Sequence, residues 1–181
     1  MPFYLLFNGP PKSGKSTLAR EAIRIFSRKG IETRHESFAG PMKQFMSVLL
    51  GQPYSSISKD EHHPVLGETP REFLIRLSER YLKPTYGHTF FGRAVTRRTQ
   101  HLPRPHVFII DDSGFTHEFS QLPRKSTCLV RIIRPGFNFS SDSRSYLPRP
   151  NLTIINDADL QKALSLTSDV VDYCISKWRI K

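Results

Sequence analysis

One motif in the sequence has the residue types and spacing of a phosphate-binding loop. Residues 9–16 read Gly-Pro-Pro-Lys-Ser-Gly-Lys-Ser, which fits the pattern G-x-x-x-x-G-K-S. The glycines let the backbone curl so that successive N–H groups face one anion, and the N-terminus of the following helix adds partial positive charge. Lys15 can reach the outer phosphates of a nucleoside triphosphate, and the Ser16 hydroxyl can ligate Mg²⁺. The residues predicted to contact the phosphates of ATP are Gly9, Lys12, Ser13, Gly14, Lys15, Ser16 and Thr17.

Two adjacent carboxylates form a second group with chemical potential. Asp111 and Asp112 follow the apolar run 107–110, which reads as a buried strand. Sheets in α/β proteins bind their ligands beyond the carboxyl ends of the strands. One of the two carboxylates is therefore expected to hold Mg²⁺ together with Ser16, through water, and the residues alone leave open which one. The alternative is a structural role, in which the acidic pair caps a helix and forms an ion pair.

The elements that must position these groups are readable from the hydrophobic pattern. The apolar run 3–7 reads as a buried strand before the motif, and the segment after the motif has the apolar face of an amphipathic helix. Further strands are predicted at 31–38, 107–110, 127–133 and 152–155. Strands that alternate with helices in this way predict an α/β fold, with a parallel sheet between two layers of helices.

Several helix boundaries follow from capping residues. Pro41 is expected in the first turn of a helix that ends at Gly51. Thr69 and Glu72 form a capping-box pattern, and Pro84 is expected to end the helix that they begin. The remaining predictions are a helix at about 89–99, a short helix at 118–119, a final helix capped by Asp157 or Asp159, and loops at 52–68, 102–106 and 137–150.

Length and charge restrict the class of protein. A chain of 181 residues suits one domain with one core. Lys and Arg outnumber Asp and Glu by 27 to 16, and the resulting net charge of +11 indicates an anionic partner, either nucleotide phosphates or nucleic acid. No apolar run approaches the length of a membrane span, and the first residues lack the order of a secretion signal. We therefore expect a cytoplasmic protein with no membrane partner, in which Cys128 and Cys174 are buried free thiols.

These segments, in this order, resemble the bacteriophage-type deoxynucleoside monophosphate kinases, a branch of the P-loop kinases. The matching segments are 9–17, 39–43, 66–74, Asp112 with 117–118, 130–136 and 154–157. The resemblance implies Mg²⁺-dependent transfer of the γ-phosphoryl group of ATP to a (deoxy)nucleoside monophosphate, in the host cytoplasm if the chain is phage-encoded. It also implies a three-layer P-loop kinase fold with a five-stranded parallel sheet of order 2-3-1-4-5. Within a single domain of residues 1–181, an acceptor-binding insertion is expected at about 39–100 and a lid-like loop at about 134–150.

The resemblance also implies roles for single residues. Asp111 is assigned to the metal with Ser16, and Asp112 to the acceptor side of the site. The residues expected to be catalytic are Lys15, Asp112, Arg71 and Arg134. The residues expected to bind the acceptor are Lys43, Arg71, Phe90, Phe91, Arg93, Asp112 and Glu118. Arginine is favoured for the acceptor phosphate because its guanidinium group binds phosphate oxygens in bidentate geometry.

One feature of the family pattern is absent. An arginine shortly after the aspartate of the third strand would help to hold the acceptor, whereas this chain reads Asp112-Ser113-Gly114-Phe115. We therefore expect another residue to take its place, with Arg93, Arg97 and Arg98 as candidates. Arg144, in the loop 137–150, is interpreted as a solvated surface charge.

Other functions fit the same motif. A P-loop kinase could act on a different acceptor, such as a polynucleotide 5′-end, a nucleoside or a small metabolite. A nucleotide-dependent nucleic-acid-binding protein would also explain the positive charge, although the chain has no recognition-helix motif and no aromatic-and-basic RNA-binding motif. Nucleic acid is therefore a less favoured partner than ATP and a nucleotide acceptor, and a homodimer remains open.

Overall fold

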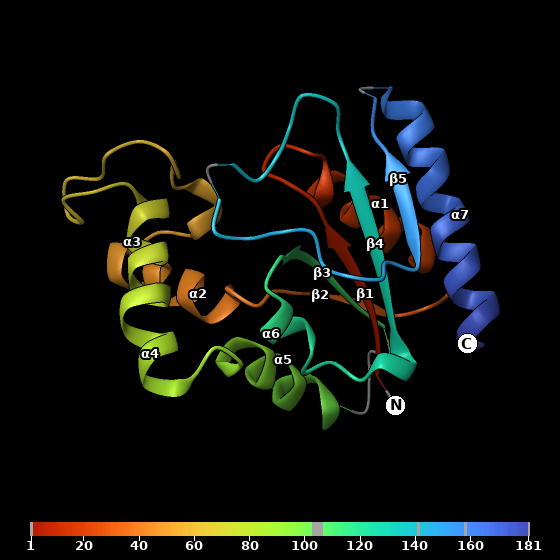
Figure 1. Cartoon of the computed structure of the whole chain (residues 1–181), viewed down its shortest axis with the longest axis horizontal. Helices are drawn as coiled ribbons and strands as arrows, with labels where there is room; N and C mark the ends of the chain where they lie inside the picture. The colour runs from red at the N-terminus through yellow and green to blue at the C-terminus, as the bar shows by residue number, and fades with distance from the viewer. Residues whose placement is uncertain (1, 103–106, 141, 158, 181) are drawn as a thin grey trace.

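The computed structural model describes residues 2–102, 107–140, 142–157 and 159–180. At its centre is a five-stranded parallel sheet with the order β2-β3-β1-β4-β5 (Figure 1). The strands are β1 (Phe3–Asn8), β2 (Thr33–Glu36), β3 (Val107–Ser113), β4 (Thr127–Ile133) and β5 (Leu152–Ile155). The predicted fold class and the predicted strand order are confirmed.

The central position of β1 follows from side chains that are buried on both faces of the sheet. Phe3, Leu5 and Phe7 belong to the core on one face, whereas Tyr4 and Leu6 belong to the core on the other. Alternation along a strand produces this division, and a strand covered on both faces reads as a continuous apolar run. By contrast, the edge strand β2 is shorter than the predicted strand 31–38, because it pairs only with β3.

Two helices cover one face of the sheet, α1 (Lys15–Arg28) and α7 (Leu160–Trp178) (Figure 1). The Asp159 carboxylate caps α7 by accepting a hydrogen bond of 3.0 Å from the Lys162 N–H. Leu160 lies in the first turn of α7, at the rim of the core, and is 53% exposed. Cys128 on β4 and Cys174 on α7 are buried and free, as predicted.

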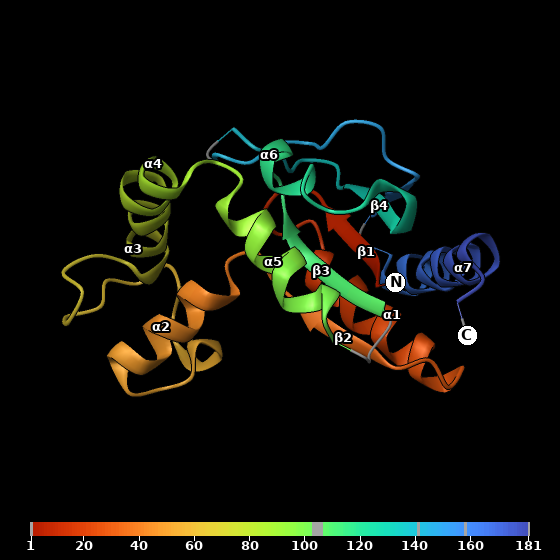
Figure 2. The same ribbon diagram turned by 90° about the horizontal axis from the view of Figure 1, so that it is seen from below.

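The opposite face of the sheet carries α5 (Phe90–Gln100) and α6 (Thr116–Phe119) (Figure 2). These two helices approach each other at Gly92. A Cβ atom at this position would overlap the carbonyl oxygen of Glu118 and would lie 2.8 Å from Cγ of Gln121. Glycine at position 92 therefore sets the distance between α5 and the segment that follows β3.

Three helices form an extension at one end of the sheet, which we call the arm: α2 (Gly40–Leu50), α3 (Pro70–Arg76) and α4 (Lys83–Tyr86) (Figures 1 and 2). Pro41 lies in the first turn of α2 and Gly51 ends it, as predicted. The capping box at the start of α3 is also confirmed. The Thr69 side chain accepts from the Glu72 N–H at 3.2 Å, and the Glu72 carboxylate accepts from the Thr69 N–H at 2.9 Å.

The prediction that Pro84 ends the helix begun at Thr69 was wrong. A π-helical turn at Leu77–Leu82 joins α3 to α4, and the chain stays helical to Tyr86 before Gly87, with φ of 86°, ends it. Proline normally breaks a helix because its ring meets a carbonyl of the preceding turn and it donates no hydrogen bond. The wider π-helical turn before Pro84 relieves this conflict.

The remaining segments are loops. The predicted loop 52–68 contains only a 3₁₀ turn at Tyr54–Ser56 and an isolated bridge between His63 and Glu68. Most of the expected linker 102–106 lies outside the described residues. A second 3₁₀ turn, Arg124–Ser126, precedes β4. Among the described residues, no helix combines the length and apolar character needed to cross a lipid bilayer.

The close approach at Gly92 predicts that Gly92→Ala destabilises the protein. The added methyl group would have to displace backbone of α6, so we expect the free energy of unfolding to fall by about 1–3 kcal/mol. Urea denaturation at equilibrium measures this change.

Gly40→Ala is the matched control, because Gly40 also lies in a helix and a Cβ there would be 3.6 Å from its nearest neighbour, Cβ of Ser37. This variant should be neutral or slightly stabilising, since alanine is the better helix former. Equal effects of the two substitutions would contradict the tight α5–α6 contact.

Candidate active site

The phosphate-binding motif forms a tight loop between β1 and α1. Its curvature requires left-handed backbone at Lys12, with φ of 61°, and at Gly14, with φ of 99°. The Ser13 N–H donates to the carbonyl of Pro10 at 3.2 Å, which closes the turn. Because α1 begins at Lys15, the loop leads directly into the first N–H groups of the helix, which have no partners within the helix and face toward an anion.

The loop is packed so tightly that its two glycines have no room for a side chain. A Cβ atom at Gly9 would lie 2.7 Å from the Ile132 carbonyl oxygen, and one at Gly14 would lie 2.6 Å from Nδ2 of Asn156. The same Asn156 amide donates a hydrogen bond of 2.8 Å to the Ser13 carbonyl. Asn156 therefore supports the loop from the end of β5, a role that the sequence did not reveal.

Lys15 lies folded into the loop. Only 8% of the residue is exposed, and its Nζ donates to the Pro10 carbonyl at 2.6 Å. Burial, and to a smaller extent the positive charge of Arg144, lower the pKa of Lys15 to about 8. The ammonium group is thus held in a partly desolvated position in which an anionic ligand would stabilise its charged form.

Asp111 lies beside the first turn of α1. Its carboxylate is 2.9 Å from Nε2 of His35 and is also hydrogen-bonded by Ser16. Burial alone would raise the pKa of Asp111, but the hydrogen bonds from His35 and Ser16, together with nearby positive charge, outweigh it and hold the pKa at about 2. The hydrogen bond to Asp111 in turn raises the pKa of His35. His35 is a further participant that the sequence did not indicate.

The donor set around Ser16 and Asp111 fits Mg²⁺. An ionised carboxylate and a hydroxyl oxygen are hard oxygen ligands, and Mg²⁺ in phosphate sites commonly uses one or two protein ligands together with phosphate oxygens and water. Among the described residues, no group of three or more His, Cys, Asp or Glu side chains could hold a metal by itself. These residues would therefore hold Mg²⁺ in a phosphate-dependent way.

The neighbouring carboxylate, Asp112, points to the start of the arm. It accepts hydrogen bonds from the N–H groups of Phe38, at 3.0 Å, and Ala39, at 3.1 Å, as well as from the Ser37 hydroxyl. Lys43, one turn into α2, lies 3.5 Å away. Asp112 thus makes the contacts of the structural alternative, a helix cap with an ion pair, and it places Lys43 at the same edge of the sheet as the phosphate-binding loop.

An irregularity in β3 sends the two carboxylates to these different partners. In the pairing of β1 with β3, Leu6 is opposite Ile110 and Asn8 is opposite Ser113. One residue of β1 therefore faces both Asp111 and Asp112 between these pairs. Bulges of this kind bend the strand and re-aim side chains, and they are common beside functional sites.

Arg134 and Arg71 lie at the rim of this site. The Arg134 guanidinium donates to the Lys12 carbonyl at 2.6 Å and lies over the ring of Phe137, 4.6 Å from its centroid. Arg71 is paired with Asp60 at 2.6 Å, and its charge interacts with that of Arg144. Both arginines are therefore on the side of the molecule where the loop is.

Arg144, which we interpreted as a solvated charge, is instead part of the site. Its side chain is 20% exposed, and Asp142 holds its guanidinium through two hydrogen bonds, of 2.8 and 2.5 Å. Its charge interacts with those of Lys15 and Asp112. Its position depends on the path of a loop across the sheet, so spacing in the sequence could not have predicted it.

The other predicted acceptor residues lie in the α5 region and make structural contacts. Phe91 is 3% exposed and belongs to the core, and Phe90 stacks on Tyr86 with ring centroids 5.0 Å apart. Arg93 donates to the Tyr86 carbonyl at 2.8 Å. Of the candidates for the missing arginine, Arg98 is engaged with Glu36 at 2.9 Å and Arg97 is exposed.

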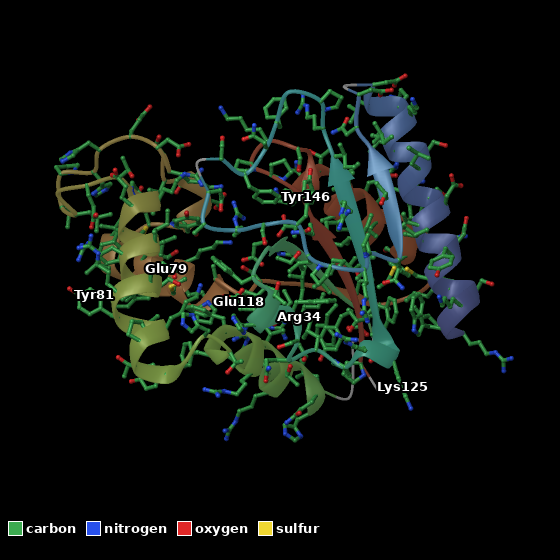
Figure 3. All side chains as sticks on the ribbon, in the orientation of Figure 1. Arg34, Glu79, Tyr81, Glu118, Lys125 and Tyr146 are labelled. Carbon is green, nitrogen blue, oxygen red and sulfur yellow. The ribbon has the colours of Figure 1, made fainter. Side chains whose placement is uncertain are left out.

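Glu118 lies in a buried cluster that joins the arm to α6 (Figure 3). The ammonium group of Lys83, which is 3% exposed, lies 2.7 Å from Glu79 and 3.7 Å from Glu118. It also lies 3.4 Å from the centroid of the Phe115 ring. Burial raises the pKa of Glu118 to about 8, an effect that the Lys83 charge reduces and the charges of Asp112 and Glu79 increase.

The raised pKa of Glu118 predicts a specific dependence of stability on pH. The folded protein keeps the Glu118 proton up to about pH 8, whereas the unfolded chain loses it near pH 4.5. Protonated Glu118 therefore contributes to the free energy of unfolding at low pH, and this contribution is lost as the pH rises toward 8. The free energy of unfolding should fall by at most about 1.4 kcal/mol per pH unit from this cause. Glu118→Gln mimics the neutral acid, so it should match the wild type near pH 5 and exceed its stability at pH 8. Urea titrations at several pH values measure the difference, and parallel curves would show that Glu118 is ionised in the folded state.

Solved structures with a similar arrangement of strands and helices include kinases. Neither a known family model nor any curated protein matches the sequence. The APS kinase CysC of Mycobacterium tuberculosis, solved in complex with AMPPNP and APS, is 14% identical, with a TM-score of 0.55 over 95% of this chain and 98% of that chain. Its Cys556Ala mutant is 13% identical, with a TM-score of 0.51 over 97% of this chain and 99% of that chain. A candidate kinase from Chloroflexus aurantiacus is 14% identical, with a TM-score of 0.52 over 97% of both chains. The chain therefore has the fold of the P-loop kinases.

Proposed function

We propose that this protein is a Mg²⁺-dependent kinase that transfers the γ-phosphoryl group of ATP to a (deoxy)nucleoside monophosphate. The observation that carries the proposal is the position of Lys15 in a curled phosphate-binding loop, with three further cations nearby that come from other segments: Lys43, Arg71 and Arg144. One phosphate-binding loop accounts for the donor. The additional cations supply the charge needed to hold a second phosphorylated molecule.

Phosphoryl transfer asks this chain mainly for positioning and charge neutralisation. Lys15 and the amides of the loop would hold the β- and γ-phosphates of ATP. Ser16 and Asp111 would hold Mg²⁺, which neutralises charge on the transferring group when it is bound. Arg134, already bonded to the loop at Lys12, would contact the donor nucleotide at the rim. Asp112 would orient the acceptor side by fixing the start of α2 and the position of Lys43.

The arm supplies the acceptor side in this proposal. Lys43 on α2 and Arg71 on α3 both come from the segment 39–100, as does Phe90 on α5, whose ring stacks on that of Tyr86. The solved relative CysC, which was crystallised with AMPPNP and APS, is consistent with a nucleotide donor on this fold. A nucleotide acceptor is the simplest second ligand for a site with cations from two sides.

A kinase assay with a panel of acceptors tests the proposal. Purified protein with ATP and Mg²⁺ should produce ADP and a nucleoside diphosphate from at least one dNMP or NMP. Lys15→Ala should remove turnover, by on the order of 10²-fold or more, because a group that stabilises the transferring charge is lost. The melting temperature should not fall, because the lysine that is removed is a partly desolvated cation.

Lys125→Ala is the matched control, since Lys125 is exposed in the 3₁₀ turn before β4. This turn is at the amino-terminal end of the strand, whereas the phosphate-binding loop follows the carboxyl end of β1. This variant should keep full activity. ATP binding without turnover of any nucleotide would contradict the proposal, and transfer to a 5′-hydroxyl oligonucleotide or a nucleoside would identify a different acceptor class.

The lowered pKa of Lys15 predicts how ATP affinity varies with pH. In the free protein Lys15 loses its proton near pH 8, whereas bound phosphates would keep it charged. Above that pH binding must take up a proton, so the affinity should fall by up to about tenfold per pH unit. Calorimetry in two buffers of different ionisation enthalpy, from about pH 7 to about pH 9.5, measures the proton uptake directly.

Lys15→Arg provides the control for this titration, because arginine stays charged throughout the range. Its affinity for ATP should be lower but independent of pH. Wild-type binding without proton uptake above pH 8 would show that Lys15 is not in contact with the phosphates.

A further inference from the structure

The loop between β4 and β5 carries Arg144, whose side chain packs against Gly114. Gly114 is two residues after Asp112 in the sequence. The stem of Arg144 lies directly on Gly114, where a Cβ atom would be 2.5 to 2.8 Å from Cβ, Cγ and Cδ of Arg144. Any side chain at position 114 would therefore displace Arg144. The backbone of Gly114 does not have a positive φ, so what the glycine provides is space.

The position of Arg144 is fixed by the backbone around it. The Ser145 N–H donates to the Gly114 carbonyl at 3.0 Å, and the Ser145 carbonyl accepts from the Asn8 amide at 3.1 Å. The next anchor is Leu147, which is fully buried and whose N–H donates to Asn8 at 2.8 Å. Figure 1 shows this part of the loop crossing from the side of the arm toward β5. The segment that carries Arg144 is thus attached to the ends of β1 and β3.

The guanidinium group is oriented but not used up. Asp142 takes the hydrogen bonds of Nε and Nη2, and it is the hydrogen-bonding partner of this side chain among the described residues. An arginine has five N–H donors, so further donors remain for a ligand. The bidentate pair with Asp142 sets the plane of the group in advance, which is how arginine is used to bind phosphate with little loss of entropy.

Arg144 lies within reach of charges of both signs. Lys15 and Arg71 carry the same charge and lie near enough to interact with it, while Asp142 and Asp112 interact with opposite sign. Lys15, Arg71 and Arg144 repel one another in this partly buried space. A bound phosphate would attract all three cations and so offset the repulsion.

We propose that Arg144 binds the phosphate group that lies between the phosphate-binding loop and Asp112, and that position 114 must be glycine to leave Arg144 its place. The inference rests on the proposed function and adds to it a residue from the loop between β4 and β5. It also identifies the cation that occupies the place of the arginine missing after Asp112. The phosphate has two sources, the terminal group of ATP and the monophosphate of the acceptor.

Four variants test the inference: Arg144→Met, Arg144→Lys, Gly114→Ala and the double variant Gly114→Ala/Arg144→Met. Methionine keeps the apolar stem and removes the charge. Lysine keeps the charge but cannot donate the two parallel hydrogen bonds of a guanidinium group. Arg124→Met is the matched control, because Arg124 is an exposed arginine in the turn before β4. For each variant, kcat, KM of both substrates, affinities for ATP and ADP, and the melting temperature are measured.

Arg144→Met should lower kcat/KM on the order of 10²-fold, with partial recovery in Arg144→Lys. Gly114→Ala should lower it by about tenfold or more, because displacement of the guanidinium by even 1 Å is costly. The double variant should be no worse than Arg144→Met alone, since the group that the alanine displaces is already gone. A rise in KM of the acceptor identifies the acceptor phosphate, and a selective loss of ATP affinity relative to ADP identifies the donor phosphate.

Wild-type kinetics in Arg144→Met, or effects of the two single variants that simply multiply, would overturn the inference. A wild-type protein that phosphorylates no acceptor would instead defeat the proposed function. In that case two binding measurements still test the role of Arg144. One is the rise in melting temperature that inorganic phosphate causes in the presence of ADP, and the other is the ratio of the affinities for ATP and ADP. Unchanged values of both in Arg144→Met would overturn the inference independently.

Discussion

The electrostatic interaction on which the site depends is the proximity of like charges, Lys15 from the start of the chain and Arg144 from near its end. Each is mostly withdrawn from water, and the charge of Arg144 adds to the effect of burial in lowering the pKa of Lys15. Carboxylates near the two cations offset this repulsion: Asp142 holds the arginine and also interacts with Lys15, and Asp111 lies by the first turn of α1. The two cations are thus held in place by the protein before any ligand arrives, which is the condition under which a phosphate binds with little rearrangement.

The carboxyl ends of the parallel strands make this arrangement possible. Parallel strands bring the end of β1, the bulge of β3 and the end of β5 to one edge, and each contributes a polar residue there: Asn8, Asp111 and Asn156. Asn8 is fully buried and bonds the backbone of both β3 and the Arg144 segment. One asparagine thus fixes the position of a distant loop relative to β3, and a loose loop could not hold a guanidinium group in one place for a ligand.

The sequence could predict whatever depends on local pattern. The glycine spacing of the loop, the apolar strands and the caps at Thr69 and Pro41 all follow from short-range rules, and the strand order came from the resemblance rather than from periodicity. What could not be predicted depends on long-range placement. In the sequence, Gly114 marks only the lack of an arginine after Asp112. The side chain that occupies the space beside Gly114 belongs to Arg144, thirty residues later. The periodicity that made Phe91 a candidate for base stacking is equally the periodicity of a core residue, which it is. Pro84 was misjudged because a π-helical turn cannot be recognised from composition.

The buried lysine of α4 has a mechanical consequence. Lys83 is enclosed by two acidic residues and lies against the face of Phe115, which belongs to the chain that leads from β3 into α6. Moving α4 away from α6 would separate Lys83 from Glu118 and from the ring of Phe115, whereas Glu79 belongs to the same helical segment as Lys83 and would move with it. These buried contacts join α4 to α6, so we expect α3 and α4 to move together with α6 and the adjoining end of β3 rather than independently of them.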